Sequence, residues 1–109
     1  MRVELLFWDG CPSHPQALRD LRAVMAELGL DPDTVEVREV DTDDAAHEER
    51  FTGSPTIRID GLDVQEPGDE PMGLTCRVYR RRDGRSSPVP DLDDVRDALR
   101  RAMTEQEPA

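Results

Sequence analysis

The spacing of hydrophobic positions along this chain alternates between that of strands and that of helices. Residues 3–8 are mostly apolar, which is typical of a short strand buried on both faces. Over residues 13–28, apolar side chains recur at every third or fourth position, which predicts an amphipathic helix. Ser13 and Gln16 fit a capping box at its start, and Gly29 is placed to end it.

The pattern continues with shorter elements. Residues 34–40 alternate β-branched and charged side chains, which predicts a second strand. Residues 41–50 are polar and acidic, and we expect a short surface helix capped by Asp41 or Thr42. Residues 51–61 predict a loop, a strand that begins after Pro55, and a turn.

The last third of the chain contains one more strand and one more helix. Residues 61–73 are rich in proline, glycine and acids, and indicate a long connection. In residues 74–79 every second side chain is apolar, which predicts a strand with Leu74, Cys76 and Val78 on its buried face. Asp91 is expected to cap a final helix. The core stripe of that helix is predicted to be Leu92, Val95, Leu99 and Met103.

The predicted order is therefore β-α-β-α-β-β-α. Strands that alternate with helices favour parallel pairing, and the last two strands, which are consecutive, favour antiparallel pairing. We expect an α/β fold with a mixed four-stranded sheet and helices on both faces. The domain is predicted to span residues 1–104, with residues 105–109 as a frayed tail.

Composition narrows the classes of function. The 109 residues suit one domain, and the net charge of -11 argues against a nucleic-acid partner. No apolar run approaches a membrane span, and the start of the chain does not resemble a signal peptide, so we expect a cytoplasmic protein without a membrane partner. No glycine-rich phosphate loop is present, and no cofactor is expected.

The side chain with the best environment for a reactive group is the thiol of Cys11, at the turn between the first predicted strand and the first predicted helix. The unpaired N–H groups and the dipole of a helix N-terminus favour a thiolate, and His14 lies three residues further on. We therefore expect a partly exposed thiol with a pKa below that of free cysteine, stabilised by the helix and by protonated His14. The alternative interpretation is a turn in which cysteine is only a small hydrophobic residue.

Two motifs, together with the element order, resemble the thioredoxin superfamily in its short, glutaredoxin-like form. They are Trp8-x-x-Cys11-Pro12-x-His14 and Gly53-Ser54-Pro55-Thr56. The resemblance implies that Cys11 is the nucleophile, that Pro55 is cis beside it, and that the Ser54 backbone pairs with a bound peptide or thiol. The substrate-binding residues that it implies are Trp8, Pro12, Ser54 and Pro55.

The chain departs from that family at His14, which occupies the place of the second cysteine. Cys11 therefore acts alone with a small thiol, or uses Cys76 as a distant partner, or belongs to a module without turnover. We expect a monothiol thiol–disulfide oxidoreductase in which His14 supports the Cys11 thiolate. Its partner is expected to be a low-molecular-weight thiol or a protein disulfide. The alternative is a non-catalytic module that binds a protein or a soft metal ion through Cys11.

Cys76 is the candidate second thiol. Its place between Leu74 and Val78 predicts a buried cysteine that does not bridge Cys11. The two cysteines are too few for a disulfide framework. The spacing of the cysteines and histidines does not match a zinc finger, so no zinc site is predicted.

Overall fold

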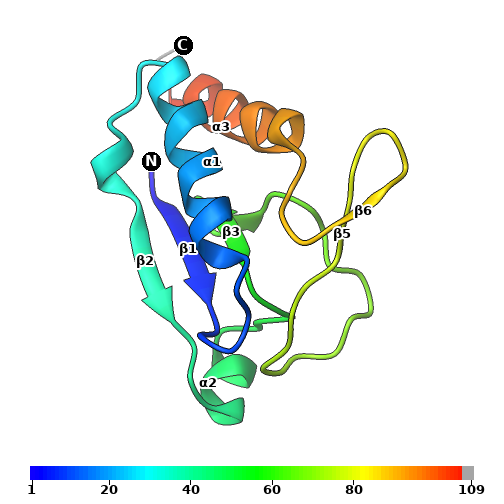
Figure 1. The fold of residues 1–109 in the computed structure, drawn as a ribbon. Helices are drawn as coiled ribbons and strands as arrows, with labels where there is room; N and C mark the ends of the chain where they lie inside the picture. Colours follow the sequence, from blue (N-terminus) through cyan, green and yellow to red (C-terminus); the bar gives the residue numbers. More distant parts are fainter. Residues whose placement is uncertain (107–109) are drawn as a thin grey trace.

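A computed structural model describes residues 1–106 (Figure 1). These residues contain three helices, six short strands and one 3₁₀ turn, Pro32–Thr34, joined by loops. The strands are β1 (Val3–Phe7), β2 (Glu36–Glu39), β3 (Thr56–Ile59), β4 (Leu62–Asp63), β5 (Tyr79–Arg80) and β6 (Ser86–Ser87). The helices are α1 (His14–Glu27), α2 (Asp43–Glu48) and α3 (Leu92–Gln106).

The main sheet has four strands in the order β2-β1-β3-β4. β1 runs parallel to β2 and antiparallel to β3, and β3 runs antiparallel to β4. The predicted mixed four-stranded sheet is therefore confirmed. The predicted position of the fourth strand, residues 74–79, was wrong, because the fourth strand is β4. Asp60 and Gly61, both with positive φ, form the turn of a tight hairpin that places β4 next to β3.

Alternate residues of β1 lie in two different cores, one on each face of the sheet. Val3 and Leu5 pack with α1 and α3, whereas Leu6 packs with Ala46 of α2 and with Phe51. Figure 1 shows α1 and α3 together against the upper part of the sheet, and α2 near the end to which β1 and β2 point. The helices thus cover both faces, as predicted.

The helix ends follow the sequence only in part. The Thr42 hydroxyl accepts from the Ala45 N–H at 3.0 Å, and the Asp91 carboxylate accepts from the Asp93 N–H at 2.9 Å, so these two caps are confirmed. Ser13 stands at the N-cap of α1 but makes no side-chain capping bond, so the capping box was wrong. α3 continues to Gln106, two residues beyond the predicted domain end, and residues 107–109 of the predicted tail lie outside the described residues.

Leu74 packs against the core cluster around Leu6, as predicted, but from Cys76 to Tyr79 the burial is the reverse of the prediction. Arg77 and Tyr79 are buried, whereas Cys76 is exposed and Val78 is 71% exposed. The Arg77 guanidinium pairs with Asp63 at 2.7 Å and lies 4.4 Å from the centre of the Tyr79 ring. Because Arg77 gains these partners inside the fold, the polar face of this segment points inward. Leu92 of the predicted α3 stripe is likewise 42% exposed.

The sheet face that carries Leu6 also carries a cluster of charges. The side chain of Glu4 is only 4% exposed, and its carboxylate lies 2.6 Å from the Arg38 guanidinium and 3.4 Å from that of Arg2. Arg38 also pairs with Glu49 at 3.0 Å. These contacts join β1, β2 and the end of α2, and they compensate the charge that Glu4 buries.

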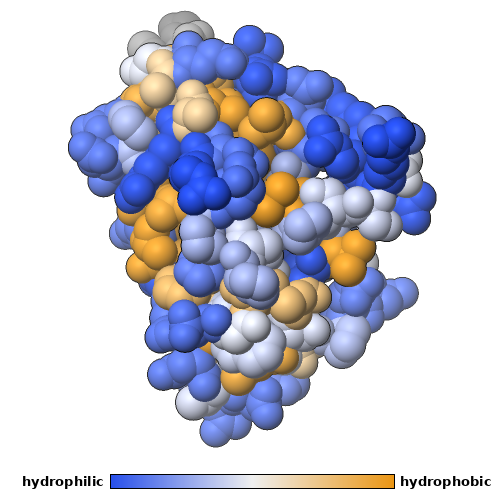
Figure 2. All heavy atoms as spheres, in the orientation of Figure 1, coloured by the Kyte–Doolittle hydropathy of each residue, from blue (hydrophilic) through white to orange (hydrophobic). Residues whose placement is uncertain are grey.

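The face of the molecule drawn in Figure 2 is predominantly hydrophilic. Figure 2 shows hydrophobic residues in separate small groups on this face rather than in one continuous patch. Among residues 1–106, no helix combines the length and the apolar character needed to cross a membrane.

Tyr79 provides a test of how the segment before β5 is held. Its ring is fully buried, its hydroxyl donates to the Pro55 carbonyl at 2.5 Å, and burial raises the pKa of that hydroxyl. We expect Tyr79→Phe to lower the free energy of unfolding by about 1–2 kcal/mol, because the ring stays while a buried hydrogen bond is lost. Urea unfolding measures the change. Val78→Ala, at an exposed neighbour, should cost far less, and equal losses would contradict the role given to the hydroxyl.

Candidate functional site

The loop between β1 and α1 holds Cys11 in a tight turn. The Cys11 N–H donates to the Trp8 carbonyl at 3.0 Å. A Cβ on Gly10 would stand only 2.4 Å from the Trp8 ring, so the turn requires glycine at this position. The turn leaves Cys11 at the start of α1 but only 2% exposed. The expected partial exposure of Cys11 was therefore wrong.

The Cys11 sulfur is surrounded by polar groups from two segments. It lies 3.3 Å from the Ser13 hydroxyl and 3.5 Å from the Ser54 carbonyl oxygen. The Ser13 hydroxyl thus faces the thiol, and this explains why it does not cap α1. The Ser54–Pro55 peptide bond is cis, as predicted, and Ser54 brings it next to Cys11.

Residues 75–77 pair with Ser54 from the other side. The Ser54 N–H donates to the Thr75 carbonyl at 2.8 Å, and the Arg77 N–H donates to the Ser54 carbonyl at 2.9 Å. This pairing is a parallel bridge that sets Cys76 opposite Ser54. Gly53 permits the close approach, because a Cβ there would stand 2.9 Å from the Arg77 Cβ.

Cys76 is therefore next to the site, although 65 positions separate it from Cys11 in sequence. It is exposed and Cys11 is buried, and both thiols are free. The predicted burial of Cys76 was wrong because residues 75–77 pair through their backbone with Ser54 and do not belong to a long strand. The Ser54 carbonyl oxygen lies 3.5 Å from the Cys11 sulfur and Cys76 is paired with Ser54, so the two cysteines lie close enough for each thiol to influence the pKa of the other.

The two thiols differ in acidity. Burial is the largest influence on Cys11 and by itself raises the pKa, but hydrogen bonds from Cys76 and Ser13 outweigh it. The pKa of Cys11 is therefore lowered, in the predicted direction. The pKa of Cys76 is raised, because its side chain is bonded to Cys11, with a further contribution from burial. Of the two thiols, Cys11 is therefore the one that loses its proton first as the pH rises.

The other residues named from the sequence lie around this pair. The His14 Nδ1 is 3.1 Å from the Cys11 carbonyl oxygen, and its ring stacks on Phe7 at 4.3 Å. His14 thus contacts the backbone of Cys11 and not its sulfur. Trp8 packs against the core cluster around Leu6, and Pro12 is exposed. The hydroxyl of Ser13 is the contact that the sequence analysis missed, because a serine before a helix was interpreted only as a cap.

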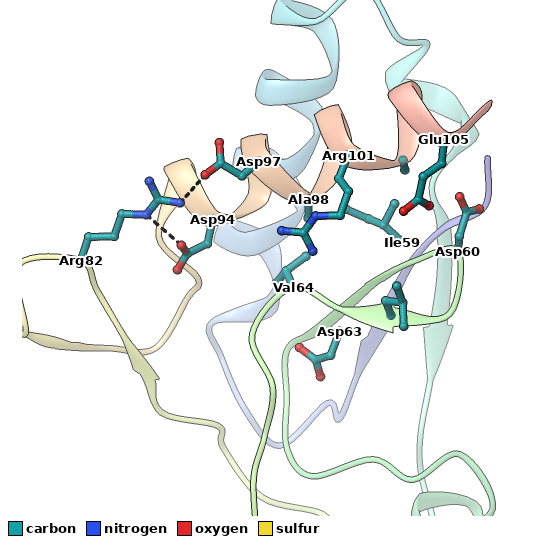
Figure 3. A pocket seen from close by; sticks show the side chains of 12 residues that line it. Ile59, Asp60, Asp63, Val64, Arg82, Asp94, Asp97, Ala98, Arg101 and Glu105 are labelled. Atoms are coloured by element: carbon teal, nitrogen blue, oxygen red, sulfur yellow. Dashed lines mark hydrogen bonds and ion pairs between the residues drawn. The ribbon is translucent and has the colours of Figure 1, made fainter. Parts of the chain in front are cut away.

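A hollow on the described residues adjoins one of the two cysteines. A hollow of about 420 Å³ is bordered by Cys76 and by residues 65–67, 70–71 and 77–80. Another, of about 120 Å³, lies between β4 and α3 (Figure 3). There Arg82 forms ion pairs with Asp94 and Asp97, which link the hairpin of β5 and β6 to α3. The larger hollow thus adjoins the candidate site through Cys76, and Cys11 does not line it.

Within the described residues, no group of three or more histidine, cysteine or acidic side chains is arranged to hold a metal ion. Comparisons with models of known protein families, with curated proteins and with solved structures gave no match.

Proposed function

We propose that this protein is a thioredoxin-like thiol–disulfide oxidoreductase in which Cys11 is the nucleophile. The observation that carries the proposal is the environment of the Cys11 sulfur. It lies at the start of a helix, beside a hydroxyl and a second thiol, and its pKa is lowered. The order of the elements and the cis bond before Pro55 support the thioredoxin-like assignment.

A lowered pKa matters because the thiolate, not the thiol, attacks a disulfide. The Cys11 thiolate attacks one sulfur of a low-molecular-weight or protein disulfide, and the other sulfur leaves as a thiolate. Cys11 then carries a mixed disulfide, which a further thiol resolves. Because Cys11 is buried and Cys76 is exposed, the substrate approaches from the side of Cys76 and its hollow.

Ser13 and Ser54 have separate roles in this proposal. The Ser13 hydroxyl donates to the Cys11 thiolate and stabilises it. The expected pairing of the Ser54 backbone with a bound peptide or thiol was wrong, because Ser54 is buried and its N–H and carbonyl already bond to Thr75 and Arg77. Pro55 keeps its carbonyl bonded to Tyr79, and this holds the segment against the core.

The acidity of Cys11 tests the proposal. We expect the rate of Cys11 alkylation by iodoacetamide to rise with pH through an inflection below about 8.5, the value of a free thiol. Ser13→Ala should move the inflection upward, because it removes a hydrogen bond to the thiolate. Mass spectrometry of the labelled peptide reads the rate at Cys11 separately from that at Cys76.

His14→Ala is the matched control, since it changes a neighbouring residue that contacts the Cys11 carbonyl. It should move the inflection less than Ser13→Ala does. An inflection at or above the free-thiol value in the unchanged protein would refute the nucleophile assignment. A larger upward shift in His14→Ala than in Ser13→Ala would show that the histidine stabilises the thiolate.

A further inference from the structure

We propose that Cys76 is the resolving thiol of this site and that Cys11 and Cys76 close to an intramolecular disulfide when the protein is oxidised. The backbone of Ser54 lies between the two cysteines and contacts both segments. Its carbonyl oxygen is 3.5 Å from the Cys11 sulfur, and the same carbonyl accepts from the Arg77 N–H at 2.9 Å. The inference deepens the proposed function and rests on it for the order of the steps.

The pairing of residues 75–77 with Ser54 is what makes Cys76 available. In a parallel bridge the paired residues lie side by side, and here the partner of Ser54 is Cys76 itself. The Cys11 sulfur lies 3.5 Å from the carbonyl oxygen of the same Ser54, so both cysteines adjoin one residue, and each thiol influences the pKa of the other. A thiol held this close attacks a neighbouring disulfide in an intramolecular step, which gives it an advantage over a thiol from solution.

The environment of Cys76 also fits a resolving role. The thiol is exposed, it borders the hollow of about 420 Å³, and its pKa is raised by its interaction with Cys11. When Cys11 becomes part of a mixed disulfide it loses its charge. The interaction that kept the proton on Cys76 then disappears, so Cys76 becomes a better nucleophile at the moment when resolution requires one.

The reaction proceeds in two exchanges. The Cys11 thiolate bonds to one sulfur of a substrate disulfide, and the other half of the substrate leaves as a thiolate. Cys76 then loses its proton to solvent or to that departing thiolate, and its sulfur bonds to the Cys11 sulfur. The bond between Cys11 and the substrate breaks, the second substrate thiolate leaves, and two electrons have passed to the substrate. Two molecules of a low-molecular-weight thiol return both cysteines to the reduced state and become one disulfide.

The stoichiometry of a single turnover tests the inference. The reduced protein is mixed with one equivalent of an aromatic disulfide, 5,5′-dithiobis(2-nitrobenzoate), whose released thiolate absorbs visible light. With both cysteines present, we expect two coloured thiolates per disulfide and a protein that carries no adduct. Digestion without reductant should yield one peptide in which Cys11 and Cys76 are cross-linked.

The variant Cys76→Ser should release only one coloured thiolate per disulfide and keep the other half on Cys11. Val78→Ser is the matched control, because it alters an exposed position on the same segment and leaves both thiols in place. It should behave as the unchanged protein. Far-ultraviolet circular dichroism verifies that both variants are folded.

The outcomes separate this inference from the proposed function. One coloured thiolate per disulfide in the unchanged protein, with an adduct on Cys11 and no cross-link, would overturn the role of Cys76. The nucleophile assignment of Cys11 would then still stand. A cross-link with two thiolates released, but no catalytic reduction when glutathione is supplied, would establish the cysteine pair and reject the oxidoreductase function.

Discussion

Disulfide reduction by this protein is expected to be lost in Cys11→Ser. A serine hydroxyl is not ionised at neutral pH, so the variant lacks the thiolate that starts the exchange, and the Cys76 thiol that remains is proposed to attack only a disulfide already formed on Cys11. We expect the rate of glutathione-linked disulfide reduction to fall by at least about 10³-fold, as removal of the nucleophile in covalent catalysis can cost up to roughly 10⁶-fold. The assay couples glutathione oxidation to the consumption of a nicotinamide cofactor by glutathione reductase.

The control for this experiment is the stability of the variant. Serine is close to cysteine in size, and the Cys11 site already contains the polar groups of Ser13 and Ser54. The midpoint of urea unfolding should therefore change little compared with the loss of rate. An unchanged rate in Cys11→Ser would reject Cys11 as the nucleophile. If the unchanged protein does not exceed the rate of glutathione alone, a non-catalytic module that binds through Cys11 becomes the better proposal.

The second large effect is expected at the buried charge of Glu4. Arg38→Met removes the guanidinium that lies 2.6 Å from the Glu4 carboxylate, and only the exposed Arg2 then remains as a partner. We expect the free energy of unfolding at neutral pH to fall by about 3 kcal/mol, since removal of one member of a buried ion pair costs about 3–5 kcal/mol. Urea unfolding followed by circular dichroism measures this loss.

A double-mutant cycle separates the ion pair from the packing of its side chains. Glu4→Gln removes the buried charge with little change of volume, so adding Arg38→Met to it should cost less than Arg38→Met alone. If Arg38→Met lowers the free energy of unfolding equally with and without Glu4→Gln, the ion pair between Glu4 and Arg38 does not contribute to stability. The measured difference between the two costs is the interaction energy of Glu4 with Arg38.

The same variant changes the response to acid. The hydrogen bond from Arg38 holds the pKa of Glu49 below its ordinary value of 4.5. This contribution to stability is complete above that value and is lost as the pH falls through the lower pKa of the folded state. Arg38→Met should therefore lose less stability below about pH 4.5 than the unchanged protein does. A parallel decline of both proteins would contradict this role of Arg38.

The class of fold could be predicted because its signals are local. The apolar run of residues 3–8 and the helical spacing of residues 13–28 act within one element, and both elements formed within about two residues of the prediction. The caps of α2 and α3 are also short-range contacts. The position of Cys11 at the start of α1 followed from these boundaries alone.

The fourth strand shows where local interpretation failed. A turn was predicted at Asp60 and Gly61, but the hairpin that it forms was not. The strand after this turn, β4, pairs with β3 through only two residues, Leu62 and Asp63, which is too short for a sequence pattern. In residues 74–79 the alternation of apolar side chains indicated the wrong buried face. Arg77 is buried because Asp63, 14 positions away in sequence, pairs with its charge, and because the Tyr79 ring covers its guanidinium.

The amino-acid sequence alone was sufficient for the order of the main elements, the mixed sheet and a cysteine at a strand-to-helix turn, since each depends on neighbours along the chain. The contact between Cys11 and Cys76 depends on how Ser54 pairs with residues 75–77, and no spacing in the sequence reports that pairing. The exposure of each thiol was likewise decided by packing. Tertiary structure thus placed the second thiol at the site, because the free energy of long-range backbone pairing and of the buried Arg77 outweighed the local hydrophobic pattern.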